Sequence, residues 1–154
     1  MAPRRKGRIL AFQALYSWDI RYNQTGDVSI PEGLLDFSWA DSDAQGSVPV
    51  SIDEKTAAFS RLLVTGTVTH IANVDSMIQK HLVNWELSRL NRVDLAVLRM
   101  SVYTLMFQGE TPPSVVIDEA VEISREFGSD DSYRFVNGVL DSVRKALSGE
   151  AVLK

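Results

Sequence analysis

The chain has 154 residues, of which 45% are hydrophobic and 23% are charged, and it contains no cysteine. This is the composition of an ordinary globular protein that is long enough to bury its own core, which excludes collagen, coiled-coil and wholly disordered chains. The lack of cysteine excludes disulfides, thiolate metal sites and cysteine nucleophiles, and it fits a reducing cytoplasm. No apolar run approaches the ~18 residues of a membrane-spanning helix.

Charge is spread unevenly along the chain, whose formal net charge is −4. Residues 1–8 carry four basic side chains and no acidic one, whereas the remainder holds 12 basic and 20 acidic residues. A basic arm on an acidic body is typical of proteins that contact nucleic acid. The alternative for residues 1–8 is a solvated tail with no partner.

The first helix is predicted over residues 4–22. Ile9, Phe12, Tyr16 and Ile20 follow helical spacing, with Leu15 and Trp18 beside them. Residues 26–52 are rich in Gly, Pro, Asp and Ser, which predicts a long connection containing one short helix. An apolar patch within that connection comprises Leu34, Leu35, Phe37 and Trp39.

Helical spacing resumes after this connection. Ser51–Glu54 has the form of a capping box, which predicts a helix from there to about His81. Gly66 lies in the middle of that helix, where glycine costs about 1 kcal/mol relative to alanine. We expect another helix to pack closely against this position. A short helical turn is predicted over residues 85–90.

The last third of the chain predicts three helices. Asn91 is placed to cap a segment, residues 93–107, that is apolar on nearly every side and is therefore expected to be central and buried. Pro112–Pro113 precede the next helix, which Gly128 ends. Ser129 is expected to cap the final helix, with Asp130 and Asp131 in its first turn. The predicted fold class is all-α, with about six or seven helices.

Enzyme motifs are missing from the sequence. It contains no Gly-x-Gly-x-x-Gly or phosphate-binding loop and no Gly-x-Ser-x-Gly elbow. His70 and His81 are eleven positions apart and cannot bind one metal ion from a single helical turn. We therefore expect no catalysis, no cofactor and no metal.

Two features favour RNA binding. The first is the basic residues of positions 4–8. They lie at a helix N-terminus, where the helix dipole disfavours positive charge, and bound phosphate groups would reverse that penalty. Phe135 lies about 100° from the core stripe of the last helix, with Asp131 one turn before it. A half-exposed ring beside a carboxylate can stack an unpaired base and bind its amino group. The alternative is that Phe135 covers a neighbouring helix.

Several blocks of the sequence resemble the NusB family. They comprise Arg4–Lys6 with Phe12–Trp18, Arg89–Arg99, Ile117–Ile123 and Phe127–Asp141. The last block, FGSDDSYRFVNGVLD, is the most specific. Together the blocks span residues 4–141 apart from the 26–52 connection.

The resemblance implies an all-helical fold of two small helix bundles packed crosswise, forming one RNA-binding domain over residues 1–154. NusB-like proteins perform no chemistry. They bind the single-stranded boxA element of ribosomal RNA leader transcripts together with NusE, a small-subunit ribosomal protein. The pair helps to assemble an antitermination complex on RNA polymerase.

The resemblance also implies roles for matching residues. The RNA-binding set is Arg4, Arg5, Lys6, Arg8, Gln13, Asp131 and Phe135, and the NusE-binding set is Tyr16 and Asp94. Residue type alone leaves an alternative for each NusE-binding residue. Tyr16 fits a core position equally well, and Asp94 fits a helix cap. Residues 111–114 lack the basic residue that some relatives carry there, which implies weaker RNA binding or a shifted contact.

Two other functions stay open at this stage. NusB-like domains also occur fused ahead of ribosomal RNA cytosine methyltransferases, so the chain could be an accessory module of that kind. A helical scaffold that binds only proteins would show no salt-dependent RNA affinity. Some relatives pair with themselves through the RNA-facing side, so a homodimer is a further alternative.

Overall fold

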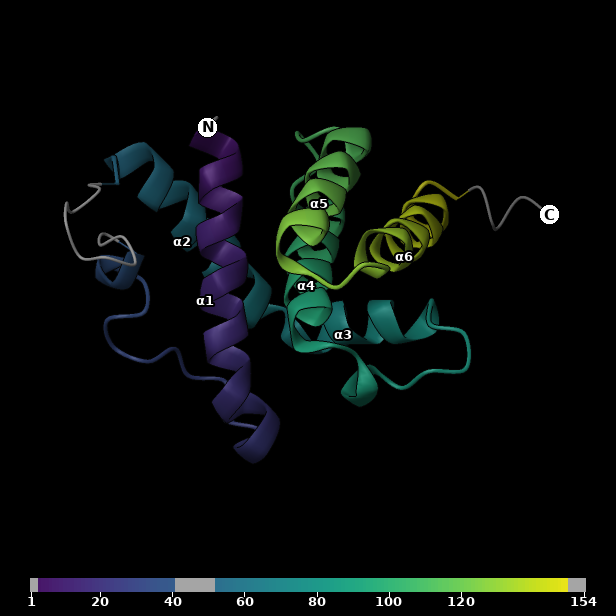
Figure 1. Cartoon of the computed structure of the whole chain (residues 1–154), viewed down its shortest axis with the longest axis horizontal. Coiled ribbons are helices and arrows are strands. Elements are labelled where there is room, and N and C mark those ends of the chain that lie inside the picture. Colours follow the sequence, from purple (N-terminus) through teal and green to yellow (C-terminus); the bar gives the residue numbers. More distant parts are fainter. Residues whose placement is uncertain (1–2, 41–51, 150–154) are drawn as a thin grey trace. The chain divides into compact units, whose positions relative to one another are not determined.

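The computed structural model describes residues 3–40 and 52–149. Over these ranges it contains six α-helices, two short 3-10 helices and no strand, which confirms the all-α prediction (Figure 1). The chain divides into two compact units, Met1–Thr65 and Gly66–Lys154. The elements are α1 (Pro3–Thr25), η1 (Ser38–Ala40), α2 (Glu54–Thr69), α3 (Ile71–Lys80), η2 (Leu87–Arg89), α4 (Arg92–Phe107), α5 (Pro113–Phe127) and α6 (Ser132–Leu147). In the part of the chain that is described, no helix has the length and apolar character needed to span a membrane.

The apolar spacing predicted for α1 is buried along only part of the helix. Leu15 and Trp18 are 1% exposed, whereas Tyr16 and Ile20 are 41% and 58% exposed. Ile9 and Phe12, which share the helical spacing of Tyr16 and Ile20, are 8% and 3% exposed, and spacing alone does not decide where this row leaves the core. The row that contains Leu15 and Trp18 is buried, and the Trp18 indole Nε1 donates a hydrogen bond to the carbonyl oxygen of Val28 at 3.2 Å. Tyr16 and Ile20 therefore lie outside the core, although they continue the helical spacing of Ile9 and Phe12.

The connection after α1 is ordered by local turns as far as residue 40. Gly26, with φ +74°, ends the helix in the left-handed region that glycine adopts without strain. The backbone N–H of Ser29 donates to Asp27 at 2.9 Å, and the hydrogen bonds from Ser29 lower the pKa of Asp27 to about 2. Phe37 is fully buried and anchors the segment, and η1 is the short helix that the sequence predicts. Residues 41–51 lie outside the described ranges.

The single helix predicted to reach His81 is in fact two helices. The backbone leaves the helical region at His70 (φ −108°, ψ 23°), so that α2 ends at Thr69 and α3 begins at Ile71. The apolar spacing continues across this break, which is why periodicity did not reveal it. The N-terminal cap also differs from the prediction, because the N–H of Thr56 donates to Asp53 Oδ1 at 2.7 Å. Ser51, the predicted cap, lies outside the described residues.

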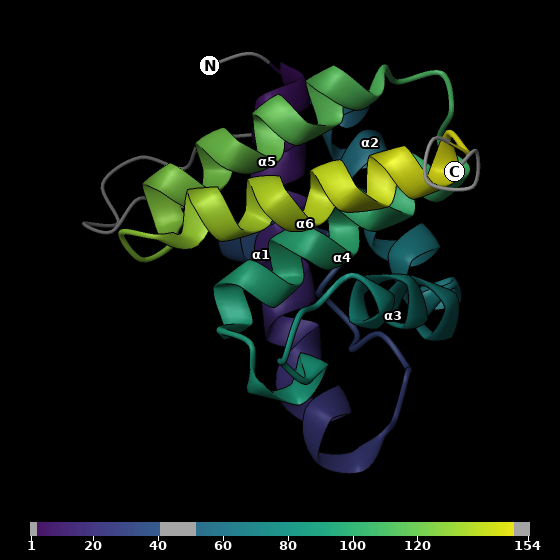
Figure 2. The same cartoon turned by 90° about the vertical axis from the view of Figure 1, so that its right-hand side faces the viewer.

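Helix α4 is the centre of the second unit, as its apolar sequence predicts. Every residue from Asp94 to Thr104 is buried. The Asn91 side chain caps the helix by accepting hydrogen bonds from the N–H groups of Val93 and Asp94. Helices α3, α5 and α6 pack against α4, and Figure 2 shows α6 lying across it beside α5. Most of α4 therefore has no solvent-facing side.

Two side chains of α4 make contacts that fix its neighbours. The Arg99 guanidinium is buried and donates from Nε and Nη2 to both carboxylate oxygens of Asp75 on α3, at 2.9 and 3.0 Å. The Tyr103 ring lies directly against Gly66, where a Cβ atom would come within 2.7 Å of the ring. The prediction that a helix packs closely at Gly66 is confirmed.

Candidate nucleic-acid interface

The four basic residues of the arm form the first turns of α1, which has no acidic residue in its first turn. Arg4 is exposed, Arg5 and Lys6 are half-buried, and Arg8 is only 8% exposed. The N-terminus of a helix carries partial positive charge, so these cations make one strongly positive end. Such an end attracts anions, and Arg4 presents the most accessible charge within it.

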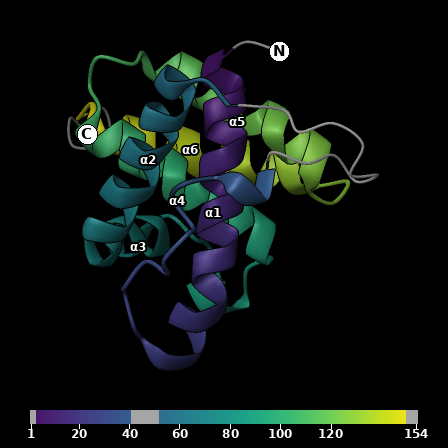
Figure 3. The ribbon, with the colours of Figure 1, turned by 90° about the vertical axis from the view of Figure 1, so that its left-hand side faces the viewer.

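The Phe59 ring organises the two arginines that lie one helical turn apart. The Cζ atoms of Arg4 and Arg8 lie 4.3 and 5.4 Å from the centroid of this ring, which belongs to α2. Figures 1 and 3 show α1 beside α2 within the first unit. Cation–π contact restricts the position of both guanidinium groups, and it leaves the charge of the exposed Arg4 accessible to a ligand. Arg4 and Arg8, four residues apart, therefore share one face of α1.

Gln13 and Tyr16 lie further along α1. Gln13 is half-buried, and Tyr16 presents 41% of its surface. The interpretation of Tyr16 as a core residue is therefore excluded. Ile20, one turn later, is 58% exposed, and sequence reasoning missed it because the residue fits the apolar spacing of the core. Tyr16 and Ile20 form an exposed apolar pair of the kind that contacts a protein partner.

The turn between α5 and α6 sets the start of the last helix. Gly128 has extended backbone, and a Cβ there would lie 2.6 Å from the Cβ of Ser132. The Ser132 hydroxyl accepts a hydrogen bond from the N–H of Ser129 at 2.9 Å. Helix α6 thus begins at Ser132, three residues beyond the predicted cap, and Asp130 precedes it. The prediction that Ser129 caps α6 with Asp130 in its first turn was wrong.

Asp131 and Phe135 are presented at this helix start. Asp131 occupies the N-cap position without a side-chain capping bond, and its side chain is 89% exposed. Arg134 pairs with it, with 3.9 Å between Nη1 and Oδ1, and an exposed pair at this distance contributes little to stability. The Phe135 ring, one turn later, is half-buried. The carboxylate is therefore accessible, and the aromatic side chain keeps part of its surface exposed.

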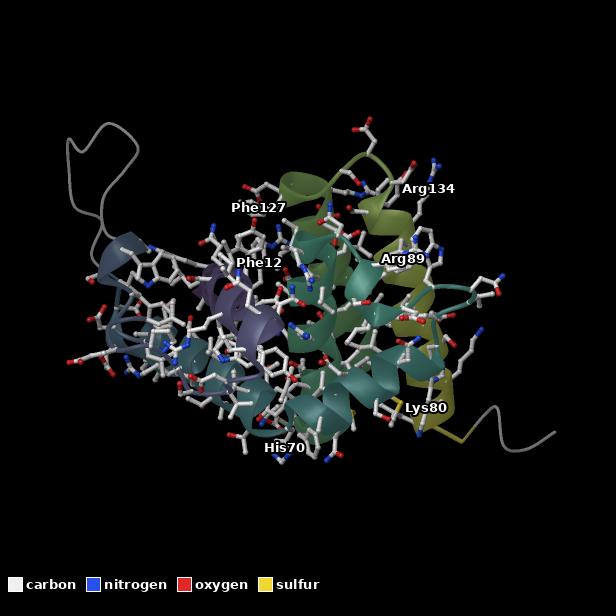
Figure 4. The ribbon with its side chains drawn as sticks, turned by 90° about the horizontal axis from the view of Figure 1, so that it is seen from below. Phe12, His70, Lys80, Arg89, Phe127 and Arg134 are labelled. Carbon is white, nitrogen blue, oxygen red and sulfur yellow. The ribbon has the colours of Figure 1, made fainter. Side chains whose placement is uncertain are left out.

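Sequence reasoning missed a basic and aromatic cluster where α5 ends and α6 begins. The Cζ atoms of Arg125 and Arg134 lie 4.5 and 5.4 Å from the centroid of the Tyr133 ring. Figure 4 shows the Arg134 side chain reaching outward from the start of α6. The adjacency of Tyr133 and Arg134 was visible in the sequence, but only the fold brings Arg125 from the end of α5. The cluster places positive charge next to the exposed Asp131.

Asp94 lies in a different environment from the exposed site residues. It is 7% exposed, its Oδ1 has no hydrogen-bond partner among the described residues, and the Ser132 hydroxyl bonds to its carboxylate. Burial raises the pKa of Asp94, and the Ser132 hydrogen bond opposes that shift. Asn91 caps α4, so the alternative of Asp94 as the cap is not what the structure shows. Asp94 instead links α4 to the start of α6.

The histidines occupy separate environments in the second unit. His70 stacks on Phe107 with ring centroids 4.1 Å apart, and His81 Nδ1 lies 2.6 Å from Ser142 Oγ. Burial lowers the pKa of His81, with a smaller contribution from the charge of Lys80. Within residues 3–40 and 52–149, no group of three acidic or histidine side chains is arranged to hold a metal ion.

These observations define an all-helical protein that carries candidate RNA-binding side chains in each of its two units. The NusB family model matches residues 5–145. The transcription antitermination protein NusB of Treponema denticola is 46% identical over 92% of this chain and 95% of its own length. The transcription antitermination protein NusB of Borreliella burgdorferi is 38% identical over 90% of this chain and 91% of its own length. The chain belongs to the NusB family.

Solved structures agree with this assignment. NusB of T. maritima has a TM-score of 0.74 and 32% identity, covering 94% of this chain and 92% of its own. A crystal structure of the antitermination factors NusB and NusE in complex with dsRNA matches with a TM-score of 0.76 and 28% identity, covering 95% and 98%.

Proposed function

We propose that this protein is a non-catalytic transcription antitermination factor of the cytoplasm, with residues 1–154 acting as one RNA-binding domain. Its ligand is single-stranded boxA-type RNA from ribosomal RNA leader transcripts. It binds this RNA together with NusE and helps to assemble an antitermination complex on RNA polymerase. Membership of the NusB family supports the proposal, and the neighbouring structure that contains NusB, NusE and double-stranded RNA supports an RNA ligand and a NusE partner.

The observation that carries the proposal is the pairing of exposed Asp131 with half-buried Phe135 at the start of α6. Phosphate contacts give affinity without sequence preference, whereas base contacts give specificity. We assign affinity to the basic arm of α1, with Gln13 beside it. Specificity comes from a base stacked on Phe135 and bonded to Asp131.

The protein partner is assigned to α1 and α4. Tyr16, exposed on α1, is the proposed NusE contact, and Asp94 is the second. Because Asp94 is buried and bonded to Ser132, its influence on NusE passes through the position of α6 or requires the partner to reach into the fold. RNA and NusE are expected to strengthen each other's binding by equal factors.

The test is a fluorescence-anisotropy titration of boxA-type and scrambled RNA, with and without NusE, at two salt concentrations. Phe135→Ala should weaken boxA-type RNA by about tenfold and scrambled RNA less, as expected for the loss of one stacked base. Arg4→Gln should weaken both RNAs equally. If all four basic residues of the arm contact phosphates, the salt slope is about −2.8. Equal losses on both RNAs from Phe135→Ala would remove that residue from recognition.

A further inference from the structure

A hollow on the surface of the first unit has a composition that the proposed function does not use. It has a volume of about 490 Å³, within the range of roughly 300–1,000 Å³ that is usual for ligand sites. The α1 and α2 side chains that line it are Arg4, Lys55, Thr56, Ala58, Phe59 and Leu62. Only Arg4 among them belongs to the set of predicted RNA contacts.

The lining of this α1–α2 hollow is divided between charge and apolar surface. Arg4 and Lys55 are both exposed and supply two cations from different helices. Ala58, Phe59 and Leu62 supply the apolar part, and Leu62 is 45% exposed although it is a large hydrophobic residue. A ligand that satisfies both parts must carry an anion and a flat apolar face close together.

The apolar floor is built before any ligand arrives. A Cβ atom at Gly7 would lie 2.6 Å from Cδ2 of Phe59, so the absence of a side chain at residue 7 lets the ring lie against the backbone of α1. The Ser60 hydroxyl donates a hydrogen bond to the carbonyl oxygen of Gly7 at 2.9 Å and is fully buried. Arg4 covers the Phe59 ring at 4.3 Å. The positions of the cation and the ring are thus fixed by packing, which lowers the entropic cost of binding.

We propose that the α1–α2 hollow seats one nucleotide of the bound RNA strand, with its phosphate on Arg4 and Lys55 and its base on Leu62, beside the Phe59 ring that Arg4 covers. The inference rests on the proposed function and extends the RNA path from the arm onto α2. A nucleotide combines an anion with a planar ring in one unit. An acidic peptide would pair with the cations but would leave the Leu62 surface without a matching group.

The test compares substitutions of Lys55, which lines the hollow, and of Lys80, which does not, both made in the full chain. Lys55→Gln should weaken single-stranded RNA about tenfold, the scale of one charge-assisted hydrogen bond, and make the salt slope less negative by about 0.7. Leu62→Ser should weaken binding and leave the salt slope unchanged. Lys80→Gln removes an exposed lysine on α3 and serves as the matched control, with no change expected (Figure 4). Circular dichroism checks that each variant is folded.

The outcomes separate this inference from the proposed function. If Phe135→Ala weakens RNA but Lys55→Gln behaves like Lys80→Gln, the hollow is not an RNA site and the proposed function stands. If the unmodified protein binds no RNA, the inference about the hollow and the proposed function both fail. If Lys55→Gln leaves RNA affinity unchanged but weakens an oligo-glutamate peptide, the hollow is a protein-binding site and the nucleotide assignment is overturned.

Discussion

Gly66→Ala should destabilise the second unit, although alanine is the better helix former. The added Cβ would lie within 2.7 Å of Tyr103 Cε1 and closer still to Cζ and the hydroxyl oxygen. The ring would have to retreat by about 1 Å to restore ordinary contact distances. It has little room, because it is 4% exposed, stacks on Phe107 at 5.6 Å, and accepts a hydrogen bond from Gln108 Nε2 at 3.0 Å.

The expected change in the free energy of unfolding is the sum of one favourable and two unfavourable contributions. Helix propensity gains about 1 kcal/mol, overpacking costs about 1–3 kcal/mol, and loss of the Gln108 hydrogen bond costs about 1 kcal/mol. We expect a net loss of about 2 kcal/mol in the free energy of unfolding, or about 4–8 °C in Tm, measured by urea and thermal denaturation. Gly66→Ala combined with Tyr103→Leu should show a favourable coupling of about 1 kcal/mol or more in a double-mutant cycle. A stabilising Gly66→Ala with no coupling to Tyr103 would refute the reasoning.

Two predictions concern the ionisable groups of the second unit. Burial raises the pKa of Asp94, so its ionisation costs stability above that pKa. Asp94→Asn should therefore raise the free energy of unfolding at pH 7, and its advantage should shrink as pH falls through the pKa of Asp94 toward 3.8. Urea denaturation across pH measures this, and an advantage that grows on acidification would contradict it. Asp75→Asn should cost about 3 kcal/mol, because it leaves the Arg99 guanidinium buried beside a neutral partner. Asp141→Asn, which breaks two more exposed ion pairs, with Arg144 and Lys145, should cost no more than about 1 kcal/mol, and a loss equal to that of Asp75→Asn would show that burial is not the cause.

The positions of the helices were largely predictable, because each buried face repeats at helical spacing. The central helix was the clearest case, since an apolar sequence on all sides leaves only a buried position. The break at His70 was not predictable, because both helices continue one apolar pattern and the change is a single backbone conformation. The start of α6 was also missed, because Ser129 is a good cap by residue type but the Ser132 hydroxyl accepts its N–H instead.

The candidate site also combines features that the sequence predicted with features that only the fold decided. Residue type and order identified the basic arm and the carboxylate–phenylalanine pair at Asp131 and Phe135, since charge and helical spacing are properties of the chain itself. Exposure was decided by packing. Tyr16 and Trp18 are both aromatic residues of α1, yet Tyr16 is exposed and Trp18 is buried, because the row of Ile9 and Phe12 leaves the core before Tyr16.

The sequence by itself determined the helical class, the cationic first turn and the family to which the chain belongs. Only the tertiary structure decided that Arg4 lies over Phe59, that Asp94 is buried against Ser132, and that Arg125 reaches Tyr133. The physical reason is that each of these contacts joins two different helices, and helical periodicity fixes which residues share a face of one helix but not which face of another helix they meet.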